Sequence, residues 1–247
     1  DSYYLDVVVN SVNGGFSGLT VDGNRLYATS YQLAATNSTP TLYQIDVDAQ
    51  SVTVQTRTLN GIKQPNGMAV DNYGRIYISD SAAVGNWLTP STAPIFRLDS
   101  FAAAPQEWLD AEYAQAFPNG IDFNADCSIM YYADANVIYS ISVLASGAAG
   151  GVLPFYTTDT SKIFDDIAVT DEFVAAAEIL SPVSASGSNT SGCIRVIDLE
   201  GDSLQTIAPD RLSEPSDILY NPANGELWVT DYFKGGLLVS HRLGLTQ

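Results

Sequence analysis

Apolar and polar residues alternate with a period of two along most of the chain, which is the pattern of half-buried β-strands. The alternating runs are short, rich in β-branched and aromatic residues, and separated by turns of Gly, Asn, Asp and Pro. TLYQIDVD at 41–48 and SVTVQTRTL at 51–59 are two examples. No apolar run approaches the ~20 residues of a membrane-spanning helix. The pattern therefore predicts an all-β fold.

The strand pattern forms an internal repeat. Each unit begins with a small or acidic residue, then an aliphatic anchor, and leads through a polar turn into a second alternating run. The anchors lie 46 to 53 residues apart, and the step from the last anchor through both termini to the first is 48 residues. They are Leu19, Met68, Ile121, Ile167 and Ile218. The repeat therefore closes on itself, as it does in a ring.

Each unit of about 50 residues holds three or four alternating runs, and four strands in such a unit are typical of a propeller blade. The last unit has only three, ending with GLLVSHRL at 236–243, and SYYLDVVV at 2–9 can supply the fourth. Joining the termini in one blade leaves no strand edge open. We expect one domain over 1–247, a five-bladed β-propeller with four antiparallel strands per blade and 3+1 closure. The alternative is a β-sandwich with chance spacing.

Charge narrows the range of partners. Ten basic residues face 28 acidic ones, and the net charge of −18 argues against binding to nucleic acid or to an anionic membrane surface. Two glycosylation sequons, at Asn37 and Asn189, lie in polar, turn-rich stretches, and the chain starts at Asp1 without a leader. Together with the low lysine content, these features favour a secreted or vesicular glycoprotein. We expect a monomer with a small-molecule partner.

The residue before each innermost strand should point into the mouth of the central channel, because all five strands start at the same face. Asn66, Asn119 and Asp165 are the candidates for catalysis at this face, and Ser17 and Ser216 for substrate binding. The other interpretation of the PNG segments at 65–67 and 118–120 is a tight turn before a strand.

A second ring of polar residues lies at the ends of the second strands: Ser30, Asp80, Asp134, Glu178 and Asp231. Acids at such positions commonly accept hydrogen bonds from backbone amides of the loop that follows, so a structural role is the leading interpretation. Glu178 stands apart because it follows a run of small residues. We therefore consider Glu178 a further catalytic candidate, which would pair with Asp165 so that one carboxyl group acts as acid and the other as base.

Long loops and aromatic residues lie at the same face. The loops after Asp80 and Glu178 are long enough to be functional. An apolar wall with a few amides and acids suits an apolar, oxygen-bearing organic molecule. The candidates for this wall are Tyr31, Trp87, Phe117, Phe164, Tyr232 and Phe233. Packing between blades is the alternative role for part of this set.

The segments QPNGMAVDNYGRIYISD at 64–80 and FPNGIDFNADCSIMYYAD at 117–134 resemble the SMP-30/gluconolactonase/strictosidine-synthase-like propellers, in repeats that cover most of the chain. That superfamily includes calcium-dependent lactonases, condensing enzymes and non-catalytic relatives, and its members usually have six blades. The lactonases of this superfamily hold their metal with two amides and an acid at such positions, and with a further acid from the first blade. The resemblance therefore implies metal ligation by Asn66, Asn119 and Asp165, whereas the first-blade acid is absent here. Calcium takes six to eight oxygen ligands, so waters or further carboxylates would have to help.

Three functions remain open. The first is a cofactor-free enzyme of the cyclase or lyase type that promotes a ring-forming addition, as in the fungal hetero-Diels–Alderases. The second is a calcium-dependent lactonase-like hydrolase, and the third is a propeller that binds a ligand without catalysis. A Ser-His-Asp triad is excluded because the one histidine, His241, lies on a strand of the last blade. The sequence carries no phosphate loop, zinc spacing or nucleotide fingerprint, so we expect no organic cofactor.

The two cysteines are predicted to be free thiols. Cys127 lies in a turn on the face away from the channel mouth, whereas Cys193 begins a strand at the mouth. A disulfide needs Cα atoms within about 7 Å, and a blade is deeper than that.

Overall fold

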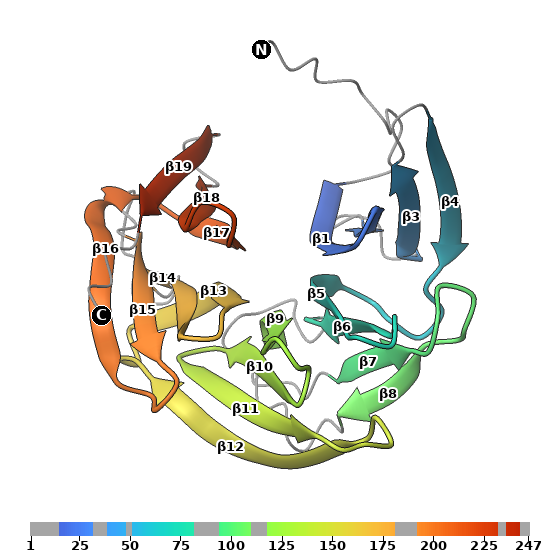
Figure 1. Cartoon of the computed structure of the whole chain (residues 1–247), viewed down its shortest axis with the longest axis horizontal. Coiled ribbons are helices and arrows are strands. Elements are labelled where there is room, and N and C mark those ends of the chain that lie inside the picture. Colours follow the sequence, from blue (N-terminus) through green and yellow to red (C-terminus); the bar gives the residue numbers. More distant parts are fainter. Residues whose placement is uncertain are drawn as a thin grey trace.

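The computed structural model shown in Figure 1 describes residues 15–31, 39–47, 51–81, 94–109, 118–180, 192–231 and 236–242. Over these ranges the chain forms strands β1 to β19 and no helix. Accordingly, the described part contains no helix that could span a membrane. The prediction of an all-β fold is confirmed.

The strands form five antiparallel sheets in chain order, four of four strands and one of three. The first two sheets contain β1 (Gly15–Asp22), β2 (Arg25–Tyr31), β3 (Thr41–Val47) and β4 (Val52–Thr58), then β5 (Pro65–Val70), β6 (Ile76–Asp80), β7 (Ile95–Leu98) and β8 (Gln106–Leu109). The third contains β9 (Pro118–Phe123), β10 (Ile129–Asp134), β11 (Val137–Val143) and β12 (Ala149–Thr157). The fourth contains β13 (Lys162–Val169), β14 (Phe173–Leu180), β15 (Gly192–Asp198) and β16 (Ser203–Leu212), and the fifth contains β17 (Pro215–Asn221), β18 (Glu226–Asp231) and β19 (Gly236–Arg242).

The sheets lie side by side around a centre. Their first strands, β1, β5, β9, β13 and β17, pack on one another in this order. Figure 1 shows these strands innermost and the described sheets in an arc, which is open between β17–β19 and β1–β4. The radial arrangement agrees with the repeat, while closure of the ring lies beyond what the described residues show.

The hydrophobic core is divided into clusters, most of them between neighbouring sheets, and four of the five repeat anchors belong to these clusters. Met68 of β5 packs with Tyr27 and Leu42 of the preceding sheet. Ile121 of β9 likewise packs with Tyr77 of β6. The period-two pattern therefore places one apolar row of β5 and of β9 against the sheet before it.

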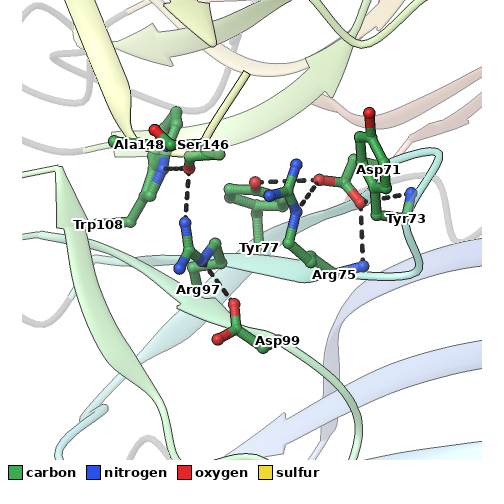
Figure 2. A network of polar contacts seen from close by, with 10 residues as sticks. Asp71, Tyr73, Arg75, Tyr77, Arg97, Asp99, Trp108, Ser146 and Ala148 are labelled. Atoms are coloured by element: carbon green, nitrogen blue, oxygen red, sulfur yellow. Dashed lines mark hydrogen bonds and ion pairs between the residues drawn. The ribbon is translucent and has the colours of Figure 1, made fainter. Parts of the chain in front are cut away.

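A polar network, shown in Figure 2, ties the third sheet to the second at the end of the sheets where the β5–β6 and β11–β12 turns lie. The carbonyl oxygen of Gly147, in the β11–β12 turn, accepts hydrogen bonds from Arg97 Nη1 at 2.5 Å and Trp108 Nε1 at 2.7 Å. Arg75 pairs with the buried Asp71 through Nε at 2.5 Å, and a Cβ at residue 147 would come within 1.8 Å of Arg75 Nη1. With φ at +78°, this position requires glycine.

Both cysteines are free, as the topology predicts. Cys127 is half-buried in the β9–β10 turn, and Cys193 is buried in β15.

Candidate functional site

The five residues aligned by the repeat occupy equivalent places in the structure. Each innermost strand carries a β-bulge at the same level, where its register with the second strand shifts. A bulge leaves a residue out of the ladder and redirects its side chain. The first unpaired residues of the five bulges are Ser17, Asn66, Asn119, Asp165 and Ser216. We call these five the mouth residues.

Glycines follow the first three mouth residues because the inner strands approach one another closely there. A Cβ at Gly18 would lie 2.2 Å from the backbone oxygen of Asn66, and one at Gly67 would lie 2.3 Å from that of Asn119. A Cβ at Gly120 would meet the fourth sheet in the same way. The inner strands of the first four sheets are therefore in near contact at the level of the mouth residues.

The first and last mouth residues are held by threonines of their own sheets. Ser17 Oγ lies 3.1 Å from Thr29 Oγ1, and Ser216 Oγ lies 3.0 Å from Thr230 Oγ1. Both serines are half-buried. The two serines thus present hydroxyl groups at equivalent positions of the first and last sheets. Their role in substrate binding stays a prediction.

Asn119 and Asp165 are joined by a hydrogen bond between neighbouring sheets. Asn119 Nδ2 donates to Asp165 Oδ1. Burial raises the pKa of Asp165 to about 7; the Asn119 amide opposes this rise, while the charges of Glu214 and Asp217 add to it. Asp165 is therefore a carboxyl group that exchanges its proton near neutral pH, which is the property of a general acid or base.

Next to Asp165 in the chain, Asp166 forms a pair of carboxyl groups with Asp217. Burial raises the pKa of Asp166 well above its ordinary value, and the carboxyl group of Asp217, which is hydrogen-bonded to it, raises it further. Asp166 Oδ2 also accepts the backbone N–H of Ile218 at 3.0 Å. Sequence reasoning missed this pair, although the repeat shows it: the first position of the unit is glycine in three units and aspartate in the fourth and fifth.

The acids at the ends of the second strands mostly support loops. Asp80 accepts the backbone N–H groups of Lys63 at 3.0 Å and Gln64 at 2.8 Å. Asp231 accepts two such groups from the loop before β17, at 2.8 and 3.3 Å. A structural role is confirmed at both positions, but the donors lie in the loop before the first strand of the sheet and not in the loop that follows the acid.

Glu178 has a different environment. Its buried carboxylate lies 2.7 Å from Lys162 Nζ, 2.8 Å from Arg195 Nη2 and 2.7 Å from Thr158 Oγ1, and the thiol of Cys193 is 3.4 Å away. Burial by itself raises the pKa of Glu178, but the hydrogen bonds from Arg195, Lys162 and Thr158 outweigh it and lower the pKa to about 2. Glu178 is therefore ionised throughout the neutral range. Lys162 and Arg195, which sequence reasoning also missed, determine this state.

Among the described residues, Asp165 is hydrogen-bonded to Asn119, and Glu178 to Thr158, Lys162 and Arg195, so the pairing of Glu178 and Asp165 as acid and base stays a prediction. Phe164 is only 1% exposed and packs in the core with Tyr131 and Ile167 rather than lining a wall. The remaining candidates lie outside the described residues, or, for Tyr31, only the backbone is described. They are Trp87, Phe117, Tyr232 and Phe233 for the wall, and Asn37 and Asn189 for glycosylation.

Asn66, Asn119 and Asp165 by themselves offer fewer side-chain oxygens than a calcium ion takes. No group of three or more His, Cys, Asp or Glu side chains in the described ranges could hold a metal. Asn119 and Asp165 are bonded to each other, and Ser17, at the position of the first-blade acid, is bonded to Thr29. Calcium takes six to eight oxygen ligands, so we derive no chemical step through this ion.

No protein-family model matches the chain, and no curated protein matches it. Several solved structures are similar. The crystal structure of a nidogen/laminin complex has 14% identity and a TM-score of 0.51, with 82% of this chain and 83% of that chain covered. A putative TolB from Agrobacterium tumefaciens has 12% identity and a TM-score of 0.50, with the same coverage.

An auxiliary nutrient binding protein from Bacteroides ovatus has 13% identity and a TM-score of 0.59, and the match covers 92% of this chain but 59% of that one. These three neighbours are β-propeller-type proteins, and likeness at such low identity shows the fold alone. Together with the radial sheets, it shows that this chain has a β-propeller fold.

Proposed function

We propose that this protein is a cofactor-free enzyme that binds an apolar, oxygen-bearing small molecule at the mouth residues. There it promotes a ring-forming addition of the hetero-Diels–Alder type. The observation that carries the proposal is the hydrogen-bonded pair of Asn119 and Asp165, with the pKa of Asp165 at about 7.

The protonated carboxyl group of Asp165 can donate a hydrogen bond to the oxygen of a carbonyl or quinone methide. This donation stabilises the negative charge that develops on the oxygen as the ring forms. Asn119 keeps the carboxyl group oriented, since its amide holds Oδ1 and leaves Oδ2 for the ligand. Holding two reactants together in the channel mouth supplies further rate enhancement through proximity.

The resemblance to the SMP-30/gluconolactonase/strictosidine-synthase-like propellers supports this class of chemistry through its condensing members, and the hetero-Diels–Alderases are the group we favour. The lactonase alternative requires calcium, which the donor set around Asn119 and Asp165 does not favour. A propeller that binds its ligand without catalysis is an outcome that the experiment below distinguishes.

The fold that carries this function is proposed to be a single domain with five blades. Residues 1–9 supply the fourth strand of the sheet β17–β19. The support is that the other four sheets have four strands each, whereas this one has three. We further propose a secreted, glycosylated monomer, on the basis of the two sequons and the strongly acidic composition.

The test uses an ortho-quinone methide generated in solution together with an apolar alkene. The rate and the enantiomeric excess of the cyclic product are measured with and without protein. We expect Asp165→Asn to lower the rate of the catalysed reaction, by up to the roughly 10²–10⁴-fold that general acids contribute. Asp126→Asn, in the exposed β9–β10 turn at the opposite end, is the matched control and should leave the rate unchanged.

Three results would contradict the proposal. Loss of turnover with a chelator and its recovery with calcium would indicate a metal enzyme. Binding of both reactants without turnover would indicate a binding protein. Unchanged binding and turnover in Asp165→Ala, Asn66→Ala and Asn119→Ala would show that the mouth residues are only structural.

A further inference from the structure

The outer strand of the first sheet, β4, has an edge that no described strand covers. It pairs with β3 through all seven of its residues without a register shift. Val52 and Val54 are 47 and 39% exposed, and five of the seven residues are β-branched. An open, regular edge of this composition readily adds a further strand, and for this reason proteins usually protect such edges.

The other outer strands that the structure describes carry this protection. β8 has only four residues, and its pairing with β7 contains a register shift. β12 contains Pro154 and β16 contains Pro209, and the pairing of each with its neighbour shifts twice. β4 has neither a proline nor a bulge, which indicates that its edge is available for pairing with a partner.

Alternate residues of β4 direct their backbone groups outward. The N–H of Leu59 donates to the carbonyl oxygen of Pro40 at 2.8 Å, which extends the β3–β4 ladder by one residue. Because antiparallel ladders alternate, Thr53, Gln55 and Arg57 bond to β3. The row of N–H and C=O groups that points away from β3 and can bond to another strand belongs to Val52, Val54, Thr56 and Thr58.

The side chains on the two faces of β4 differ. Val52 and Val54 lie on one face together with Val47, which pairs with Val52 from β3 and is 46% exposed. Arg57 lies on the other face, toward the second sheet, where its Nη1 donates to the carbonyl oxygen of Phe101 at 2.8 Å. A strand paired with β4 therefore meets apolar side chains on one face and a cation on the other.

Charge favours an acidic partner at this edge. The chain has 28 acidic residues, but none of them lies within residues 49–70, which contain β4 and carry two cations, Arg57 and Lys63. Elsewhere the chain repels an acidic segment, because its net charge is −18. Opposite charges on paired strands stabilise the pairing and steer the approach of the partner.

We propose that β4 is a docking site for an extended segment of another protein, which alternates apolar and acidic residues and adds antiparallel to the first sheet as a fifth strand. The apolar side chains of the segment lie beside Val52 and Val54, and its acidic side chains lie on the face of Arg57. Figure 1 shows β4 at the outer rim of the arc and β1 on the inside, so a docked partner leaves the mouth residues accessible. The inference does not rest on the proposed reaction.

The test measures binding of a labelled seven-residue peptide that alternates valine and glutamate, by fluorescence polarisation with the full chain. We expect saturable binding that weakens as salt is added, because exposed charges are screened. The control is the same peptide with lysine in place of glutamate, and it should bind more weakly.

A proline in β4 separates edge pairing from other contacts. Thr56→Pro removes an N–H that points outward and none that bonds to β3, so the sheet should be retained. Peptide binding should weaken by roughly tenfold or more, since a hydrogen bond is lost and the edge is blocked. Thr56→Val keeps the N–H and is the matched control, with unchanged binding. Circular dichroism of both variants checks the fold.

A second measurement leaves the protein unchanged. In the proposed pairing the valines of the peptide lie opposite the β4 residues whose N–H groups point outward. N-methylation of the valines should therefore abolish binding, whereas N-methylation of the glutamates should leave it intact. Absence of binding, equal binding of the lysine peptide, equal effects of the two N-methylated sets, or unchanged binding in Thr56→Pro would overturn the proposal. Dimerisation of the wild type that Thr56→Pro abolishes would also overturn it, because β4 would then pair with a second copy.

Discussion

Asp165 and Glu178 lie on paired strands of one sheet, yet their proton affinities are opposite. The pKa is about 7 for Asp165 and about 2 for Glu178. Both carboxyl groups have lost water through burial; they differ in their donors. One amide group faces Asp165, whereas Arg195, Lys162 and a hydroxyl group face Glu178. Burial thus decides the proton affinity of Asp165, whereas the cations and the hydroxyl group around Glu178 outweigh burial there.

Removing a cation should have the largest effect. Arg195→Met leaves the carboxylate of Glu178 buried with one cation fewer, and breaking a buried pair typically costs about 3–5 kcal/mol of the free energy of unfolding. Urea denaturation measures this loss. Arg25→Met is the matched control, since its pair with Asp46 is exposed and should contribute little to the free energy of unfolding. Equal losses in the two variants would contradict the comparison.

Acid should selectively weaken the contribution of Glu178. Because its pKa is lowered from 4.5 to about 2 in the folded state, its contribution is complete above pH 4.5 and is lost as the pH falls toward 2. The two values correspond to on the order of 3 kcal/mol. Glu178→Gln should flatten this part of the curve of unfolding free energy against pH. An unchanged slope between pH 5 and 2, by chemical denaturation, would count against the ion pairs.

Asp165 should show the opposite sign. The pKa is raised from 3.8 to about 7, so the folded state holds its proton where the unfolded state has lost it, and stability falls as the pH rises through this range. Asp165→Asn should remove the slope. After allowance for partial exposure, the variant should be more stable than the wild type at pH 8 by on the order of 2 kcal/mol. A variant that is less stable at pH 8 would show that the carboxylate is stabilised when ionised.

The smallest effect concerns the thiols. Burial, and then the charge of Glu178, raises the pKa of Cys193 to about 11, whereas Cys127 is half-buried in a turn. At pH 8, Cys193 should therefore react with iodoacetamide roughly tenfold or more slowly than Cys127. Mass spectrometry follows both sites. Without reductant, denatured protein should label twice, and a single or absent label would show that the thiols are not both free.

Much of the fold could be predicted from the sequence because one rule, alternation with a buried anchor, is repeated. Met68 and Ile121 are buried as the repeat predicts. Leu19 obeys the same pattern but is exposed, because no described sheet packs against it. Alternation determines which face of a strand is apolar, and a neighbouring sheet is needed to bury that face.

The candidate site was predictable in position but not in chemistry. The mouth positions followed from the repeat, since a bulge recurs at one level. The protonation of Asp165 and Glu178 depends on partners far away in the chain: Asn119 lies on another sheet, and Arg195 lies on the strand next to Glu178. Phe164 was assigned to a wall because it adjoins Asp165, whereas neighbours on a strand point to opposite faces.

The bulges have a consequence for how such a protein can evolve. A bulge residue stands outside the alternation, so the mouth residues can change without moving the anchor that follows each of them. The five positions here already hold two serines, two asparagines and one aspartate around nearly constant aliphatic anchors. The inner strands thus form a fixed frame with five positions that can be substituted independently, and new ligands could be accommodated by substituting the mouth residues one at a time.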